Sequence, residues 1–357
     1  MQGDTTPLQY ADNVRYWRIK QKRRALALGS AKREKQARLK RRQKIARPTV
    51  IFKDKGRRSH LLSGVRQNSA SSASSAETKL ALVKKDSISG DQFYTKSEIA
   101  KECLDKLSEI VNFDLFDTII EPSSGKGVFF NLLPVDKRIG IDLEPKCEGV
   151  IQMDYLDFEP PPNKRIAVVG NPPFGINSRS AVRFFGHSAR FAEVIAFIIP
   201  RTWKRISVQN RLSLDFELIF NMDLPMTPCC FTPKMNAKCC FQIWVRTSQP
   251  RQKIRQESTH PDFEFLKMGP NDINGQPTPN PDADFVMRAY GSNCGQLYTE
   301  NLMSLRPKSY HWIKARIDIV LLKERFEMLD YSISKDTCRQ DSIGRKELIH
   351  LYKSSFN

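Results

Sequence analysis

Residues 168–175 read VVGNPPFG, and this stretch decides which fold the rest of the chain can build. The apolar run that leads into it, residues 166–169, has the continuous hydrophobicity of a strand buried on both faces in a parallel sheet. Open α/β sheets bind their ligands outside the carboxyl ends of such strands. The stretch therefore predicts a parallel sheet whose binding edge carries Asn-Pro-Pro-Phe at residues 171–174.

These four residues suit one kind of chemistry. The exocyclic amine of a nucleobase is a poor nucleophile because its lone pair is delocalised into the ring. A site that accepts both N–H hydrogens favours an attacking nitrogen, and the Asn171 side-chain oxygen and the Pro172 carbonyl are such acceptors. Pro173 stiffens the loop, and Phe174 offers a ring for stacking. The alternative is a turn that only ends a strand, because Asn-Pro pairs are common turn formers.

A second motif lies upstream at residues 119–129, IIEPSSGKGVF. It predicts a strand and a glycine-bearing turn, with Gly125 and Gly127, that leads into a helix. Such a turn lets the backbone approach a nucleotide-like cofactor closely, although the third glycine of the dinucleotide fingerprint is missing.

Two further strands are predicted after this turn. The strand at residues 138–142 ends in Asp142, a carboxylate placed to bind ribose hydroxyls. After a short segment at residues 151–153 that contains the apolar Ile151 and Met153, Asp154 and Tyr155 suit an adenine, one by holding its amine and the other by covering its face.

In this order and spacing the motifs resemble those of class I S-adenosylmethionine-dependent methyltransferases. Within that family the chain is most similar to the amino-methyltransferases that carry Asn-Pro-Pro-Phe or Asn-Pro-Pro-Tyr, especially the adenine-N6 nucleic-acid methyltransferases. The resemblance covers residues 92–246. It implies a Rossmann-like α/β fold, with a doubly wound, mostly parallel seven-stranded sheet, and S-adenosyl-L-methionine as the cofactor.

The resemblance also implies roles for individual residues. Residues 171–174 would hold the target amine and base, and Phe241 would stack on the other face of that base. The positions that match the family's cofactor-binding motifs are Phe93, Tyr94, Thr95, Glu121, Pro122, Ser123, Gly125, Gly127, Asp142, Asp154, Tyr155 and Asn171. The pair Ser123-Ser124 departs from the family pattern, and no large recognition domain is visible, which leaves the substrate open.

Residues 201–205, RTWKR, follow a predicted strand at residues 197–200. Arg201 can meet substrate phosphates there, and Trp203 can stack on a base. The alternative is a solvated loop that contains one core tryptophan.

Charge is concentrated at the N-terminus. Residues 1–67 hold 20 Lys and Arg against 4 Asp and Glu, a net charge of +16 out of +19 for the whole chain. This basic arm, with local helix propensity at residues 25–45, is expected to bind a polyanion, nucleic acid first, or to act as a nuclear address. A solvated tail with no fixed partner is the third alternative.

The remaining chain divides by composition. Residues 68–91 form a linker rich in Ser and Ala, residues 92–249 the methyltransferase domain, and residues 250–357 a C-terminal extension. Residues 97–111 predict the first helix of the domain, and residues 313–329 predict a helix in the extension. The extension is either a target-recognition element or an elaboration packed on the sheet.

The cysteines give no clear metal site. Residues 229–230 and 239–240 are two adjacent pairs without the spacing of a structural zinc site, so we expect no metal and half-buried thiols instead. No apolar stretch approaches the roughly 18 residues that span a bilayer, and no signal peptide is visible, so the protein is expected to be soluble and intracellular, and nuclear if eukaryotic.

The sequence leaves three functions open. The first is methylation of a base amine, most simply adenine N6 of DNA or RNA. The second is methylation of a protein glutamine, whose amide has the same delocalised lone pair. The third is an inactive subunit that binds nucleic acid or a catalytic partner.

Overall fold

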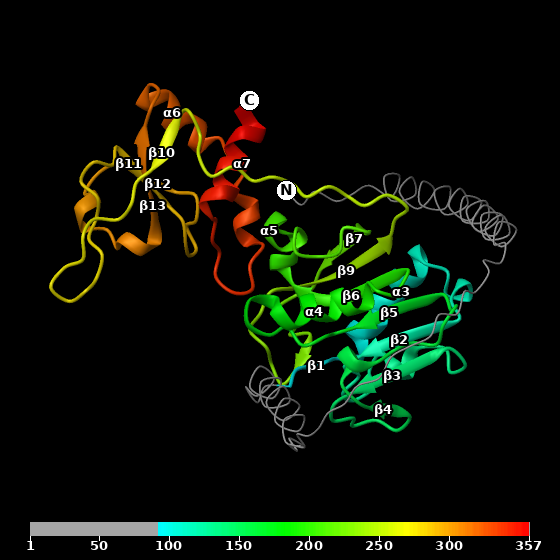
Figure 1. Ribbon diagram of the computed structural model, residues 1–357. Helices are drawn as coiled ribbons and strands as arrows, with labels where there is room; N and C mark the ends of the chain where they lie inside the picture. Colours follow the sequence, from blue (N-terminus) through cyan, green and yellow to red (C-terminus); the bar gives the residue numbers. More distant parts are fainter. Residues whose placement is uncertain (1–91, 357) are drawn as a thin grey trace, which may run out of the picture. The chain divides into compact units, whose positions relative to one another are not determined.

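The described residues contain a seven-stranded sheet (Figure 1). The computed structural model describes residues 92–356, so the basic arm, its expected helix and the linker lie outside the described residues. The strands, in their order across the sheet, are β4 (Val150–Gln152), β3 (Arg138–Asp142), β2 (Thr118–Pro122), β5 (Ile166–Gly170), β6 (Val194–Pro200), β9 (Cys239–Arg246) and β7 (Phe216–Asp223).

The first five of these strands run parallel, and β9 is antiparallel to both of its neighbours, β6 and β7. Every residue of β2, β5 and β6 is buried, as their continuous apolar sequences require. The mostly parallel seven-stranded sheet predicted from the sequence is therefore confirmed.

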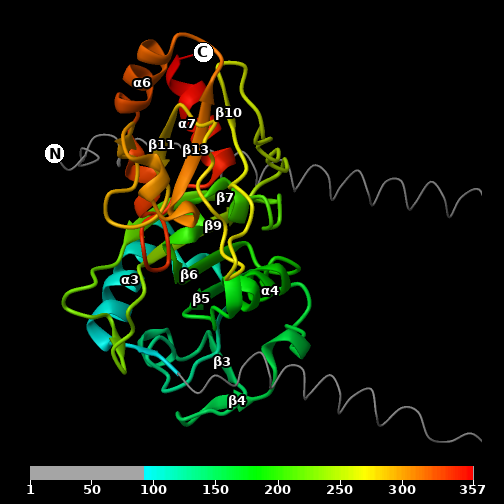
Figure 2. The ribbon, with the colours of Figure 1, turned by 90° about the vertical axis from the view of Figure 1, so that its left-hand side faces the viewer.

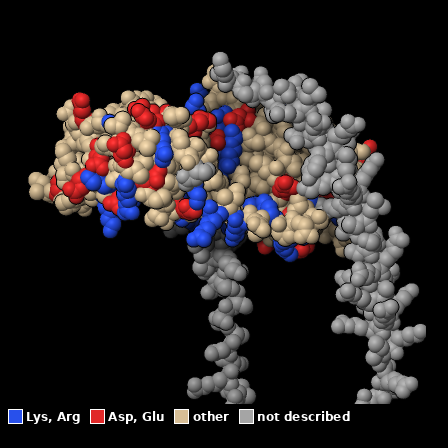
Figure 3. Space-filling view, turned by 90° about the horizontal axis from the view of Figure 1, so that it is seen from above, with Lys and Arg blue, Asp and Glu red and all other residues tan. Residues whose placement is uncertain are grey.

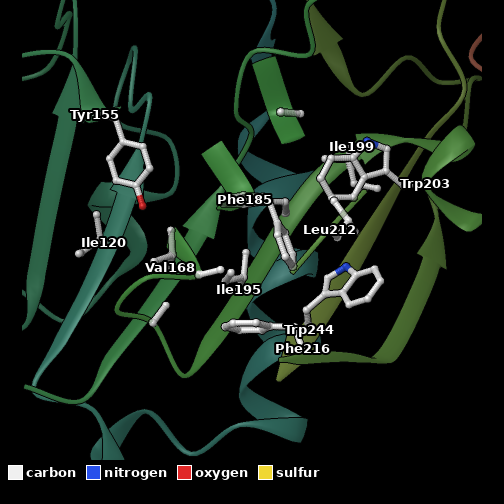
Figure 4. Close-up of a cluster of buried hydrophobic side chains, with 14 of the residues drawn as sticks. Ile120, Tyr155, Val168, Phe185, Ile195, Ile199, Trp203, Leu212, Phe216 and Trp244 are labelled. Atoms are coloured by element: carbon white, nitrogen blue, oxygen red, sulfur yellow. The ribbon is translucent and has the colours of Figure 1, made fainter. Parts of the chain in front are cut away.

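Helices cover both faces of the sheet. Figure 2 shows α3 (Ser97–Ile110) on one side of the strands and α4 (Arg179–Ser188) on the other. The short α5 (Ile206–Gln209) follows β6. Helix α3 is the first helix predicted from the sequence, and its apolar stripe is buried as expected. On the α4 side, Phe185 packs edge-on against Trp203, Phe216 and Trp244 (Figure 4).

The glycine turn after β2 does not lead into an α-helix, contrary to the prediction. The chain forms only a 3₁₀ turn, Phe130–Leu132, before β3. Gly125 and Gly127 both have positive φ, which keeps their stretch out of the helical region, and Pro134 restricts the residue before it to extended backbone. Too few residues remain between them for a longer helix.

The C-terminal region has its own antiparallel sheet of four strands. In order across that sheet they are β10 (Phe263–Phe265), β13 (Tyr310–Ala315), β11 (Phe285–Arg288) and β12 (Leu297–Tyr298). Helices α6 (Ile319–Glu327) and α7 (Arg345–Phe356) pack on one face, in a core that includes Phe326 and Tyr352. We call residues 263–356 the C-terminal subdomain.

The helix predicted at residues 313–329 is only half correct. Its first part is the end of β13, where Trp312 and Ile313 point into different cores on the two faces of the sheet. The helix starts after Asp318, whose carboxylate accepts a hydrogen bond from Leu321 N at 2.9 Å. Val320 and Leu321 are exposed and do not belong to the apolar stripe.

One more pair of strands lies outside both sheets. β1 (Tyr94–Thr95) pairs antiparallel with β8 (Phe231–Thr232). This pairing fixes the start of the described chain next to the segment that leads into β9.

Candidate functional site

Asn171 follows β5 in the middle of the sheet, at the binding edge predicted from the sequence. Its Nδ2 donates to the Phe93 carbonyl at 3.4 Å. Its Oδ1 is buried and accepts no hydrogen bond from any described residue. A buried acceptor without a donor costs roughly 1–3 kcal/mol, so such atoms usually have a partner. The geometry thus leaves a buried acceptor with no donor among the described residues.

The loop after Asn171 is tightly constrained. Pro172 is buried, Pro173 is exposed and Phe174 is half-buried. At Gly175, where φ is +67°, a Cβ would lie 2.3 Å from Ser180 Oγ, so only glycine fits. The Phe174 carbonyl accepts from Ala181 N at 3.3 Å, which ties the loop to α4.

Segment 92–95 crosses this edge beside Asn171, since Phe93 accepts the hydrogen bond from Asn171 Nδ2. Thr95 is 6% exposed, and its hydroxyl also has no hydrogen-bond partner among the described residues. Two buried polar atoms without partners therefore come from two segments that are in contact. Tyr94 lies over the glycine turn, because a Cβ on Gly125 would come within 2.8 Å of its ring.

The glycine turn forms a close-fitting cradle after β2. Ser123, Gly125 and Gly127 all have positive φ, between 51° and 72°. A Cβ on Gly127 would lie 2.4 Å from Cys147 Sγ. Ser124 Oγ donates to the Glu121 carbonyl at 2.9 Å and accepts from Ile141 N at 3.1 Å, which fixes the turn to β3.

Glu121 is the most unusual ionisable group at this edge. It lies in β2, is 3% exposed and accepts a hydrogen bond from Phe130 N at 2.7 Å. Burial raises the pKa of its carboxyl from 4.5 to about 8, because no cation among the described residues compensates the lost hydration. A positively charged ligand next to it would reverse that shift.

Asp142, the last residue of β3, and Asp154, which follows β4, also lie at this edge. Asp142 accepts from Gly125 N at 2.7 Å and from Glu144 N at 2.8 Å, so it braces the glycine turn and keeps further acceptor capacity. Asp154 caps a 3₁₀ turn by accepting from Leu156 N at 2.9 Å. Because parallel strands end at one edge, the structure brings Glu121, Asp142 and Asn171 together with segment 92–95.

A network around Tyr94 has no counterpart in the prediction. Lys146 Nζ donates to the Tyr94 hydroxyl at 2.6 Å and to Gln92 Oε1 at 2.7 Å. The ammonium groups of Lys126 and Lys146 lie 4.7 and 5.2 Å from the centre of the Tyr94 ring. Neither lysine belongs to a recognisable motif, so no signal in the sequence indicates this role.

The sequence predicts that Tyr155 covers a ligand at this edge. The structure instead places its ring in the core (Figure 4). It is 2% exposed, and its hydroxyl is 2.7 Å from Ser188 Oγ. Its ring packs against Phe184 and His187. The 3₁₀ turn that begins at this residue directs the ring inward, and Ser188 satisfies the hydroxyl, so a core position is favourable.

Three predicted substrate contacts are also corrected. Trp203 is 0% exposed and packs on Phe185, which matches the alternative of a core tryptophan. Phe241 is fully buried within β9 and offers no free ring face. Arg201 uses its guanidinium inside the protein, with hydrogen bonds to the carbonyls of Cys239 and Leu224.

The neighbouring cations of the RTWKR segment have a structural role. Arg205 forms an ion pair with Glu347 at 3.0 Å and donates to the carbonyls of Asp336 and Ser342. Lys204 pairs with Asp223 at 2.7 Å and with Asp336 at 3.1 Å. These contacts fasten the C-terminal subdomain to the end of β6 and leave no free cation here for a phosphate.

Two negative findings apply to residues 92–356. No group of three or more His, Cys, Asp or Glu side chains in this part of the chain is arranged to hold a metal ion. No helix there is long and apolar enough to cross a membrane.

Comparison with known proteins gives weak matches. No protein-family model and no curated protein matches the chain. Among solved structures, the 23S rRNA methyltransferase ErmE is 20% identical, with a TM-score of 0.32 over 45% of this chain and 71% of its own. The N-methyltransferase NodS from Bradyrhizobium japonicum is 10% identical, with a TM-score of 0.32 over 42% of this chain and 96% of its own. Scores this low establish neither the family nor the activity of this chain.

Proposed function

We propose that this chain is an S-adenosylmethionine-dependent N-methyltransferase that acts on an exocyclic amine of a nucleic-acid base, adenine N6 in DNA or RNA. The observation that carries the proposal is the buried Oδ1 of Asn171, an acceptor that no described residue satisfies. Asn171 is the first residue after β5 and the first residue of the Asn-Pro-Pro-Phe segment.

A base amine fits this acceptor. It presents two N–H donors in the plane of a ring, which Asn171 Oδ1 and the Pro172 carbonyl would accept. Phe174, half-buried beside them, would stack on that ring. Both acceptors are held before the substrate arrives, so they need no reorganisation as charge develops on the nitrogen. Because positioning and these acceptors suffice, the scheme requires no general base among the described residues.

The residues at the edge also fit the cofactor. The glycine turn closes so tightly that a Cβ at Gly125 or Gly127 would collide with its neighbours. Asp142 would bind ribose hydroxyls with its remaining acceptor capacity, and Glu121 would balance positive charge in the methionine part. Thr95 would donate or accept through its free hydroxyl. Bound there, S-adenosylmethionine supplies the sulfonium methyl group that the amine nitrogen takes up, and the amine then loses a proton to water.

Charge supports a nucleic-acid substrate over a protein glutamine. Residues 1–67 carry a net charge of +16, which favours a polyanion and costs affinity for most protein surfaces of mixed charge. In the experiment that follows, methylation of a protein glutamine predicts labelled glutamine, and an inactive subunit predicts no labelled product.

The first test supplies purified full-length protein with isotopically labelled S-adenosylmethionine and, separately, DNA, total RNA and a protein extract. The expected result is label in N6-methyladenine of one nucleic acid, identified by mass spectrometry after digestion. Label in glutamine would replace the proposed substrate class. Absence of both label and cofactor binding would refute the enzyme proposal.

The matched variants are Asn171→Ala and Asn274→Ala, the second in an exposed loop of the C-terminal subdomain. Loss of a preorganised acceptor lowers kcat by about 10²-fold or more, so Asn171→Ala should lose turnover and keep cofactor affinity. Asn274→Ala should behave like the unmodified protein. Full activity of Asn171→Ala would rule out the proposed role.

A further inference from the structure

The C-terminal subdomain contains a small basic cavity that the proposed function does not use. It has a volume of about 230 Å³ and is lined by Tyr290, Arg306, Lys308 and Ser309. None of the four is acidic. We call it the Tyr290 pocket.

Two neighbouring strands build this pocket. Tyr290 follows the end of β11, and residues 306–309 precede β13, which pairs with β11. The ladder continues past the strand ends, since Ala289 N donates to Ser309 O at 2.9 Å. The walls therefore stand on hydrogen-bonded backbone and are held without a ligand.

Arg288 holds the backbone of Tyr290 in place beside the pocket. Its Nε donates to the Tyr290 carbonyl at 2.9 Å, and its Nη1 donates to the Tyr310 hydroxyl at 2.8 Å. Its guanidinium also lies over the Tyr310 ring, 5.2 Å from the ring centre. These contacts position the backbone of Tyr290 and leave its side chain, which is 50% exposed, free at the rim.

The cations of the pocket are available. Arg306 and Lys308 are exposed, and neither forms an ion pair with any described residue; the only side-chain contact of Lys308 is with Gln276 Oε1 at 3.2 Å. The nearby Asp341, whose carbonyl accepts from Gly291 N at 2.8 Å, is already neutralised by Lys238. The two cations that line the pocket therefore have no acidic partner among the described residues.

The size and chemistry of the pocket indicate its ligand. Its volume lies below the roughly 300–1,000 Å³ of pockets that enclose a whole small molecule. Two cations and a hydroxyl suit a phosphate, and an exposed tyrosine ring suits a base that stacks outside the cavity. A phosphate and a planar base that are joined through a sugar form the repeating unit of a nucleic acid.

We propose that the Tyr290 pocket binds a backbone phosphate of single-stranded nucleic acid, with the adjacent base stacked on Tyr290. This inference rests on the proposed function for its substrate class and adds a second contact surface, on the C-terminal subdomain. The strand that carries the target amine, or its flanking sequence, is held there while the amine occupies the site at Asn171.

The test measures binding of fluorescently labelled single-stranded RNA and DNA to full-length protein over a series of salt concentrations. Each phosphate contact on a single strand contributes about 0.7 to the slope of log affinity against log salt, so loss of the one phosphate contact in Arg306→Ala/Lys308→Ala should reduce that slope by about 0.7. Tyr290→Ala should weaken binding about five-fold or more, whereas Tyr290→Phe, which keeps the ring, should bind like the unmodified protein.

The matched control is Lys323→Ala/Lys346→Ala, which removes the same charge from helices α6 and α7. The basic arm is identical in all variants, so differences between them report on the pocket. If Arg306→Ala/Lys308→Ala or Tyr290→Ala binds like the unmodified protein, or no better and no worse than the control, the inference is overturned.

Binding and turnover separate this inference from the proposed function. A protein that neither transfers a methyl group nor binds the cofactor, but loses nucleic-acid binding in the pocket variants, would support the pocket and refute the enzyme proposal. A protein that methylates a base with unchanged binding in the pocket variants would do the reverse.

Discussion

Asn171 and Thr95 each bury a polar atom that no described residue satisfies, and these atoms lie on two segments in contact. Proteins rarely keep such atoms in the folded state, because each costs about 1–3 kcal/mol. A ligand that supplies the missing partners removes that cost only when it is bound. These two unsatisfied atoms therefore lower the stability of the protein without a ligand, and they would strengthen the binding of a ligand that supplies their partners.

Thr95→Val tests this reasoning. The change keeps the shape and removes the unsatisfied hydroxyl, so the free energy of unfolding should rise by about 1 kcal/mol while affinity for S-adenosylmethionine falls. Urea denaturation and calorimetric titration measure the two quantities. Thr337→Val is the matched control, because its buried hydroxyl also lacks a partner but lies in the C-terminal subdomain. It should gain stability without loss of cofactor affinity. Equal losses of affinity in both variants would contradict a role for Thr95.

Glu121 predicts a pH dependence. Its folded pKa of about 8 lies above its usual 4.5, so between these values the folded protein holds a proton that the unfolded chain releases. Stability contributed by this group therefore falls as pH rises through that window, at about 1.4 kcal/mol per unit at most. A cationic ligand favours the ionised carboxylate, so its binding releases the proton and tightens with rising pH up to about 8.

Calorimetric titration of the cofactor between pH 6 and pH 9 measures this effect, at up to about tenfold in affinity per pH unit. Glu121→Gln should bind more weakly and lose this part of the dependence, while Glu98→Gln, an exposed position in the first turn of α3, should not. The comparison also cancels the ionisation of the ligand itself. An identical pH profile for Glu121→Gln would show that Glu121 keeps one protonation state throughout.

At the scale of elements, the RTWKR segment joins the two folded parts of the described chain. The ion pair between Arg205 and Glu347 is nearly buried, with 12% and 9% of the two side chains exposed. Removal of one partner of a buried pair costs about 3–5 kcal/mol, because the other charge stays desolvated.

Arg205→Ala should therefore lower the free energy of unfolding by about that amount and speed hydrogen exchange in α7. Arg183→Ala on the exposed face of α4 is the control and should change stability by no more than about 0.5 kcal/mol. Unchanged exchange in α7 would mean that other contacts hold the subdomain in place. The same substitution should leave cofactor affinity intact, since Arg205 contacts no residue of the cradle.

The sequence predicts those elements whose pattern is local and unambiguous. The apolar runs of β5 and β6 are long enough to be read as buried strands, and α3 shows a clear apolar stripe. The prediction of one helix over residues 313–329 was wrong in its first part, because a strand with period two and a helix with period 3.6 meet there within a few residues. Asp318, a cap at that junction, is the signal that separates them.

Residues of the candidate site divide in the same way. The structure places Asn171, Glu121 and Asp142 at one edge, as predicted, because strand ends in a parallel sheet share that edge. Trp203 and Arg201 were misplaced because a basic, aromatic segment looks the same whether its cations meet phosphates or fasten a distant subdomain. Only the structure shows that Arg205 forms an ion pair with Glu347, because the residues near Arg205 in the sequence do not indicate a partner 142 positions later.

At the scale of the whole molecule, charge is unevenly distributed along the chain. Residues 1–67 carry +16 of the total +19, so the remainder carries +3. Figure 3 agrees with this, since Lys and Arg are interspersed with Asp and Glu on the visible face of the described residues. The nonspecific, salt-sensitive part of nucleic-acid affinity is thus expected from the arm, and base selection from the folded residues.

Charge removal in the arm tests that division of roles. Replacement of Lys40, Arg41, Arg42 and Lys44 by Gln removes four cations. The slope of log affinity against log salt for single-stranded nucleic acid should fall by up to about 2.8, at about 0.7 per phosphate contact, with binding weaker at every salt concentration. Exchange of Lys40 and Lys44 for Arg and of Arg41 and Arg42 for Lys keeps the charge and should keep the slope.

Cofactor affinity should be unchanged in both variants, because the cradle lies within residues 92–156. If the Gln variant keeps the full slope, the arm does not contact phosphates, and the affinity must come from cations of the folded residues such as those of the Tyr290 pocket.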